Sequence, residues 1–174
     1  MSEPGGRGAR DKISAMKIIL SAVEPSLSEA WKTFCGHLEN VTLHQGSILD
    51  LAVGAVVSPA NSFGFMDGGI DLLYSHAFGW HVRDRHQKLI RDWHHSEFLV
   101  GTAEIVETGH PRIPYLIAAP TMRVPMILGD SVNPYLAARA ALLLGRGIYP
   151  ATWADAQARN QLPFSNRVRD LQRP

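Results

Sequence analysis

Residues 56–71 read VVSPANSFGFMDGGID, and this stretch decides the fold. It begins inside the almost continuously apolar run Leu51–Val57, which predicts a strand covered on both faces. Asn61 follows the strand within a few residues, and helical spacing begins near Ile70. The stretch therefore predicts a strand, a loop and a helix in immediate succession.

The loop between this strand and this helix is rich in glycine. Gly64, Gly68 and Gly69 allow positive φ angles and close approach of the backbone to a ligand. A helix that begins near Ile70 would direct its free N–H groups at whatever the loop encloses. This arrangement is typical of a phosphate cradle. An ordinary turn between a strand and a helix is the alternative.

Apolar runs and amphipathic segments alternate on both sides of this loop. The pattern predicts further strands at 17–23, 41–45, 102–107 and 115–119, and helices at 27–38, from Ile70 into the 80s with a break near Gly79, and at 134–144 with Asn133 as N-cap. Alternating strands and helices indicate an α/β protein, here a three-layer α/β/α domain with a mixed, largely parallel sheet. Ligands of such sheets bind beyond the carboxyl ends of the strands.

The composition agrees with one soluble globular domain. The chain has 174 residues, of which 45% are hydrophobic and 19% are charged. It contains no apolar stretch of roughly 18 residues and no secretory signal, so we expect no membrane partner and a cytoplasmic location. The formal net charge of +1 gives no overall basic field. We therefore expect local binding of any phosphate, and nucleic acid only as a modified substrate.

The residues that commonly bind metals are not clustered. Cys35 is the single cysteine and cannot form an internal disulfide or a zinc site. His76, His81 and His86 are spaced by five residues, which turns each about 140° around a helix from the one before. We expect no metal and no cofactor.

Four segments, which follow one another along the chain at 45–48, 68–71, 101–103 and 108–110, resemble the macro domain family. Gly68-Gly69-Ile70-Asp71 is similar to its first glycine loop, and Gln45-Gly46-Ser47-Ile48 is similar to its Gly-Asp-Ile segment. Gly101-Thr102-Ala103 and Thr108-Gly109-His110 resemble its Gly-x-Ala and Thr-Gly-Tyr/His elements. The resemblance covers residues 16–144. Residues 1–15 have no apolar period, so we expect a disordered leader at 1–15, a macro-like domain at 16–144 and a divergent tail at 145–174.

The resemblance implies a ligand, because macro domains bind ADP-ribose. Some members hydrolyse ADP-ribosyl bonds or remove the phosphate of ADP-ribose 1″-phosphate. By similarity, Asn61 would contact the distal ribose, and the backbone of Gly68, Gly69 and Ile70 would hold the pyrophosphate and ribose. Asp71 would be the catalytic residue, since a carboxylate in the first turn of a helix can activate water at the anomeric carbon.

The sequence departs from the family pattern in three places. Ser47, next to Ile48 in the expected adenine site, stands where the family usually has Asp. The segment Ser58-Pro59-Ala60-Asn61 stands where the family often has Asn-Ala-Ala-Asn, so the first amide is lost. After the helix at 134–144, the family continues with a strand, a second glycine-rich loop and a helix, for which residues 145–174 show no pattern.

Three functions follow from these observations. The first is a macro-like domain that binds ADP-ribose, or a macromolecule carrying it, and hydrolyses an ADP-ribosyl bond or ADP-ribose 1″-phosphate. The second is a reader that binds ADP-ribose without catalysis. The third is a degenerate fragment that serves only as an interaction surface.

Overall fold

The computed structural model describes residues 16–148, the last three without their side chains. The predicted leader and most of the predicted tail lie outside the described residues, so the division of the chain stays a prediction. Within residues 16–148, ten elements follow one another: β1 (Ile18–Ala22), α1 (Pro25–Cys35), β2 (Val41–Gln45), the 3-10 helix η1 (Ile48–Asp50), β3 (Ala55–Ser58), α2 (Gly69–Phe78), α3 (His81–Trp93), β4 (Glu104–His110), β5 (Ile113–Ala118) and α4 (Asn133–Ile148).

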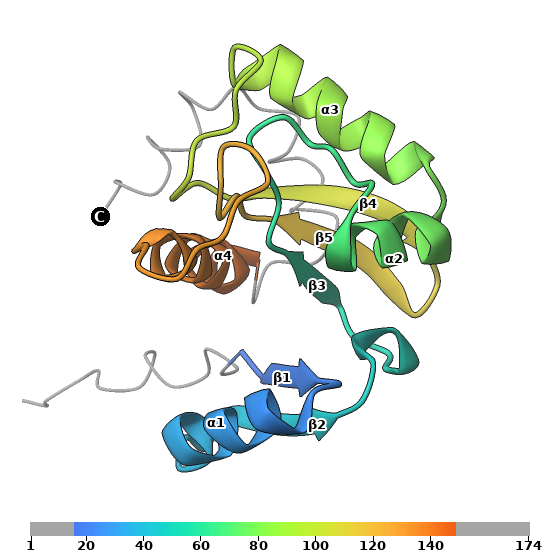
Figure 1. The fold of residues 1–174 in the computed structure, drawn as a ribbon. Coiled ribbons are helices and arrows are strands. Elements are labelled where there is room, and N and C mark those ends of the chain that lie inside the picture. Colours follow the sequence, from blue (N-terminus) through green and yellow to red (C-terminus); the bar gives the residue numbers. More distant parts are fainter. Residues whose placement is uncertain (1–15, 149–174) are drawn as a thin grey trace, which may run out of the picture.

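The first three elements form a unit of their own. β1 and β2 pair in parallel, with Ile18 opposite Val41. Pro25 occupies the first turn of α1, where its missing N–H has no helical partner to lose. α1 covers β1 and β2, and Figure 1 shows this unit apart from the other strands.

The other three strands form the sheet that carries the predicted loop. Their order is β3-β5-β4, in which β3 pairs with β5 in parallel and β4 pairs with β5 in the opposite direction. Helices α2 and α3 lie on one face and α4 on the other (Figure 1). The expectation of a three-layer α/β domain with a mixed sheet is confirmed.

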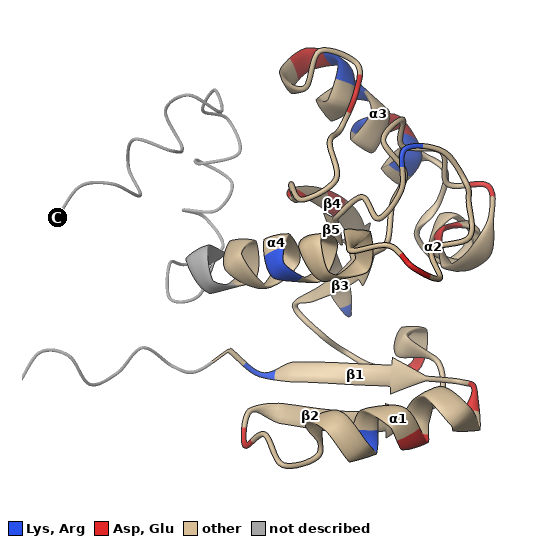
Figure 2. Cartoon of the chain, turned by 60° about the vertical axis from the view of Figure 1, so that its left-hand side comes forward, with Lys and Arg blue, Asp and Glu red and all other residues tan. Residues whose placement is uncertain are grey.

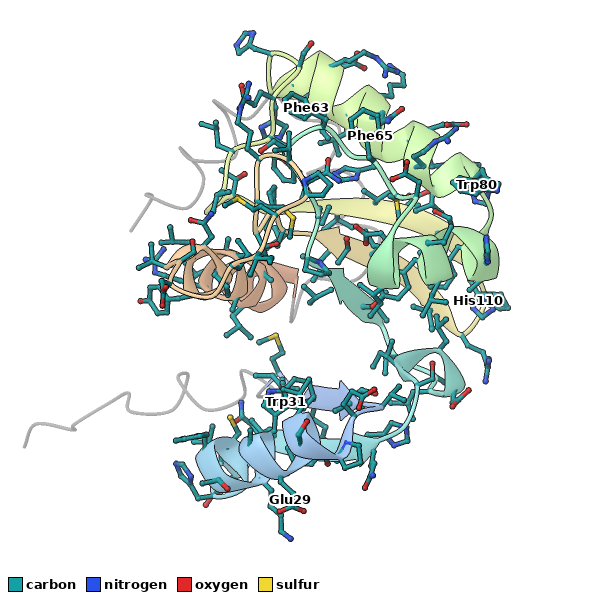
Figure 3. The ribbon with its side chains drawn as sticks, viewed as in Figure 1. Glu29, Trp31, Phe63, Phe65, Trp80 and His110 are labelled. Carbon is teal, nitrogen blue, oxygen red and sulfur yellow. The ribbon has the colours of Figure 1, made fainter. Side chains whose placement is uncertain are left out.

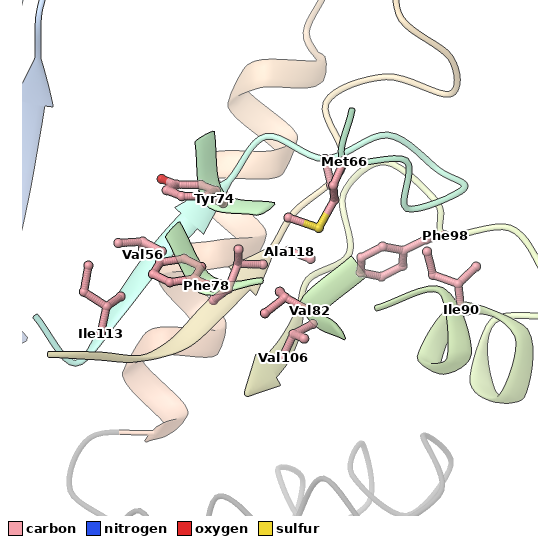
Figure 4. Close-up of a cluster of buried hydrophobic side chains, with 12 residues drawn as sticks. Val56, Met66, Tyr74, Phe78, Val82, Ile90, Phe98, Val106, Ile113 and Ala118 are labelled. Carbon is pink, nitrogen blue, oxygen red and sulfur yellow. The ribbon is translucent and has the colours of Figure 1, made fainter. Parts of the chain in front are cut away.

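Two apolar clusters hold these layers together. The larger lies between the sheet and helices α2 and α3, and Figure 4 shows its members, among them Val56, Tyr74, Phe78, Val82 and Val106. The smaller lies on the opposite face, where Ala137 and Ala141 of α4 pack with Ile105 of β4 and Ile117 of β5. Burial on both faces fixes the position of β5 at the centre of the sheet.

The third strand is shorter and less covered than its sequence predicts. β3 begins at Ala55, because Val53 lies before the ladder and donates its N–H to Arg112 O at 2.9 Å. Val57 is 48% exposed, so the expectation of a strand covered on both faces is wrong at this residue. Val56 and Ser58 point to the opposite, buried face.

The helices agree with the pattern except at their ends. The predicted break at Gly79 is confirmed, and its φ of 95° explains why glycine stands there. α4 begins at Asn133 itself, one residue earlier than predicted, and continues through Gly145. A Cβ at Gly145 would lie 2.8 Å from Met16 Sδ, so glycine allows this close contact.

None of the helices between residues 16 and 148 is long and apolar enough to cross a membrane.

His86 is a buried polar residue without a hydrogen bond. It lies on α3, is 1% exposed, and neither ring nitrogen has a partner within the described part of the chain. Its ring faces Phe98 at 5.9 Å between centroids. Burial lowers the pKa of His86 from 6.5 to about 4, and the nearby His94 adds to this effect while Glu104 opposes it.

We predict that His86 makes the fold sensitive to acid. Below pH 6.5 the unfolded chain binds a proton that the folded chain does not bind until about pH 4, so stability is full above pH 6.5 and falls between these values. His86→Leu should remove about 3 kcal/mol of the loss in unfolding free energy between pH 7 and pH 4. Denaturant titrations at both pH values measure it, with His37→Leu at an exposed position as the control. An equal loss in both variants would contradict the prediction.

Candidate functional site

The side chain of Asn61 holds the loop between β3 and α2. Its Nδ2 donates to Phe65 O at 2.8 Å, and its Oδ1 accepts from the backbone N–H groups of Phe63 and Phe65 at 3.1 and 3.2 Å. Asn61 also forms a parallel bridge with Met122, and Ser62 N donates to Met122 O at 3.1 Å. The loop is thereby tied to the chain that follows β5. A contact of Asn61 with a ribose stays a prediction.

The N-terminus of α2 is open to solvent. Gly68, Gly69 and Ile70 are exposed, and a Cβ at either glycine would meet no atom within 4 Å. Gly69 has a φ of 56°, a conformation that favours glycine. The first N–H groups of a helix have no partners within it and attract anions. The arrangement therefore fits the predicted phosphate cradle.

Asp71 lies one residue further along, in the first turn of α2, but is buried. It is 7% exposed, and its Oδ1 accepts a hydrogen bond of 2.5 Å from the hydroxyl of Ser58, which is 1% exposed. The two residues are 13 positions apart in the sequence. They meet because Ser58 ends β3 on the face that α2 covers.

Burial changes the acidity of this carboxyl group. It raises the pKa of Asp71 from 3.8 to about 6, and the hydrogen bond from Ser58 opposes part of that rise. Tyr74, one turn later on α2, donates to Val57 O at 3.2 Å. Its burial and the nearby Asp71 charge both raise the pKa of Tyr74, so the phenol is neutral. Asp71 is thus a carboxyl group that changes charge close to neutral pH.

Ser47 and Ile48 follow β2, at the start of the 3-10 helix η1. The Ser47 hydroxyl accepts a hydrogen bond from Leu49 N at 3.2 Å and so caps η1. Ile48 is partly buried against the larger apolar cluster. Their predicted contacts with an adenine ring stay a prediction.

Two aromatic side chains accompany the loop. Phe65 is 51% exposed, and its ring lies 6.4 Å from that of Phe63 (Figure 3). The guanidinium of Arg123 stacks on Phe63 at 5.3 Å and forms an ion pair with Glu97 at 2.6 Å. The third aromatic side chain of this region, Tyr74, is 1% exposed and belongs to the core. The exposed aromatic surface beside the loop therefore comes from Phe65 and Phe63.

A cavity of about 550 Å³ lies elsewhere, between β1 and α4. Its lining includes Met16, Ile18, Asn40, Tyr135, Arg139 and Leu142. None of the lining residues belongs to the loop or to the first turn of α2. The cavity is therefore separate from the site that the sequence predicts.

Sequence reasoning missed Ser58 as a partner of Asp71. From the sequence, Ser58 is considered only because it stands where the family often has Asn. Strand alternation puts Ser58 on the same face as Val56. The alternation of the strand could have indicated this contact, but only if the strand had been predicted to end at Ser58.

Comparison with solved structures identifies the fold. The macrodomain of Mycobacterium tuberculosis DarG matches this chain with a TM-score of 0.50 at 18% sequence identity, over 75% of this chain and 90% of its own. The chain has the macrodomain fold. Two mutant forms of the Oceanobacillus iheyensis macrodomain, one of them with ADPR, give a TM-score of 0.48 at 21% and 19% identity over 57% of this chain. The chain spans 54% of the length of those two structures. No family model and no curated protein matches the sequence.

We predict that Asp71 destabilises this macrodomain fold at neutral and alkaline pH. Because its pKa is about 6 in the folded chain and 3.8 in the unfolded chain, its contribution to stability is full below pH 3.8 and is lost as pH rises through 6. Asp71→Asn should raise the unfolding free energy at pH 8 by about 2–3 kcal/mol and have little effect at pH 4. Denaturant titration measures both. Asp67→Asn, in the exposed part of the loop, is the control. A gain of the same size at both pH values would refute this explanation.

Proposed function

We propose that this macrodomain fold binds ADP-ribose through the loop 61–71. The observation that carries the proposal is the open N-terminus of α2, where Gly68 and Gly69 leave room beside free backbone N–H groups. A diphosphate fits such a site because its charge is opposite to that of the helix end. The order of motifs, which resembles that of a family binding ADP-ribose, supports the same ligand.

The charges of the domain favour a local anion site over a nucleic-acid surface. α3 carries both positive and negative side chains (Figure 2). Arg83 pairs with Asp84 at 3.0 Å, and Lys88 pairs with Asp92. A polyanion would meet no continuous basic face on this helix. A small ligand with two phosphates would need only the backbone donors of the loop.

The proposed reaction is hydrolysis at the anomeric carbon of the distal ribose. Asp71 takes a proton from a water molecule, the water oxygen bonds to the anomeric carbon, and the bond from that carbon to the leaving group breaks. The leaving group then receives the proton, so that free ADP-ribose and the unmodified acceptor result. The pKa of about 6 leaves most of the Asp71 carboxyl groups ionised at pH 7 and able to accept this proton.

A reader without catalysis is the second candidate. The burial of Asp71 favours it, because a carboxylate that is 7% exposed can serve mainly to hold α2 against β3. Both candidates require the same ligand and differ in turnover.

We predict that ADP-ribose binds far more tightly than AMP, because only ADP-ribose places a diphosphate and a second ribose in the loop. Asn61→Ala should weaken ADP-ribose binding by about 1–3 kcal/mol, since the loop loses the side chain that holds it. Isothermal titration with both ligands measures this. Asn40→Ala is the matched control, because the Asn40 amide bonds to Met16 O, far from the loop. Equal affinities for AMP and ADP-ribose would exclude the diphosphate cradle.

We predict that Asp71→Ala abolishes release of ADP-ribose from a modified substrate and changes its affinity much less. An interaction made mainly in the transition state affects turnover more than binding. Single-turnover assays with radiolabelled ADP-ribosylated protein measure release, and Asp84→Ala, at an exposed position on α3 outside the loop, is the control. Binding without turnover in the unaltered protein would favour the reader.

A further inference from the structure

The side chain of Ser58 is directed at the carboxylate of Asp71. It is the last residue of β3, and the alternation of the strand directs it, with Val56, toward α2. Its hydroxyl donates to Asp71 Oδ1 at 2.5 Å, and both side chains are buried. Hydrogen bonds to an ionised acceptor in such surroundings are strong.

The neighbouring hydroxyl groups are engaged elsewhere. Tyr74 donates to Val57 O, and Ser75 donates to Met66 O at 2.9 Å. Between residues 16 and 148, Ser58 is thus the side chain that donates a hydrogen bond to Asp71, and Oδ2 accepts none. One carboxylate oxygen is held and the other is available.

We propose that Ser58 is the positioning residue of Asp71: its hydroxyl holds Oδ1, keeps the carboxylate ionised and leaves Oδ2 to meet water. The role in hydrolysis rests on the proposed function. A hydrogen bond between two buried side chains fixes the direction of the carboxylate, and a group held in one direction does not have to reorient for the reaction.

The hydrogen bond from Ser58 affects whether Asp71 is ionised, because Asp71 is buried. Burial favours the protonated carboxyl group, and the hydrogen bond from Ser58 opposes that effect. Tyr74, on the same helix, adds no charge of its own, because burial and the nearby Asp71 both raise its pKa and keep the phenol neutral. From β3, Ser58 itself faces the carboxylate. Loss of the hydroxyl therefore leaves burial without this opposition.

The experiment is a carbon-13 NMR titration of the Asp71 carboxyl group in the ligand-free protein, with Asp71→Asn to assign the signal. Ser58→Ala should raise the measured pKa of Asp71 by about 1, and Ser58→Thr, which keeps the hydroxyl, should restore it. Ser75→Ala removes another buried hydroxyl of the same region and should leave the titration unchanged. If Ser58→Ala does not fold, Ser58→Cys, a weaker donor of similar size, replaces it and should raise the pKa by a smaller amount.

The pH profile of ADP-ribose release gives the second readout. In Ser58→Ala the acid limb should move to higher pH by the same amount as the titration, and in Ser58→Thr it should match the unaltered protein. An Asp71 titration that is the same with and without the Ser58 hydroxyl would overturn the proposal. Because the titration needs no ligand, it reports on Ser58 even if ADP-ribose fails to bind, and calorimetry reports that failure separately.

Discussion

The hydrogen bonds of the Asn61 side chain hold the ten residues between β3 and α2 in one shape. These bonds close the loop on itself, and after it come Gly68, Gly69 and Ile70 at the surface and Asp71 buried in the first turn of α2. The bridge to Met122 fixes the same loop to the end of β5. The open N-terminus of α2 and the buried carboxylate of Asp71 therefore both follow directly on the loop that Asn61 holds.

The burial of Asp71 is unfavourable for folding and useful for chemistry. A carboxyl group that titrates near pH 6 opposes the folded state at neutral pH, and the hydrogen bond from Ser58 offsets part of this effect. Strongly altered pKa values concentrate at functional sites, because proton transfer requires groups that change charge near the working pH. The same contact would also hold a reader together, so turnover decides between the two functions.

Local patterns in the sequence predict most of the fold. Apolar periodicity finds β2 at its observed ends and places the break at Gly79, and the glycines around Asp71 predict the helix start. The features that the sequence does not predict depend on contacts between residues far apart in the chain. The exposure of Val57 depends on how far the helices cover β3, and the close contact between Gly145 and Met16 joins α4 to the start of the described chain. The bond between Ser58 and Asp71 joins two elements, so neither local pattern contains it.

The most direct test of the account follows the backbone amides of the protein by NMR while ADP-ribose is added. If the N-terminus of α2 is the diphosphate site, the largest shifts belong to the amides of Gly69, Ile70 and Asp71, because these N–H groups lie at the open helix end. Shifts confined to the cavity between β1 and α4, or no shifts at all, would contradict it.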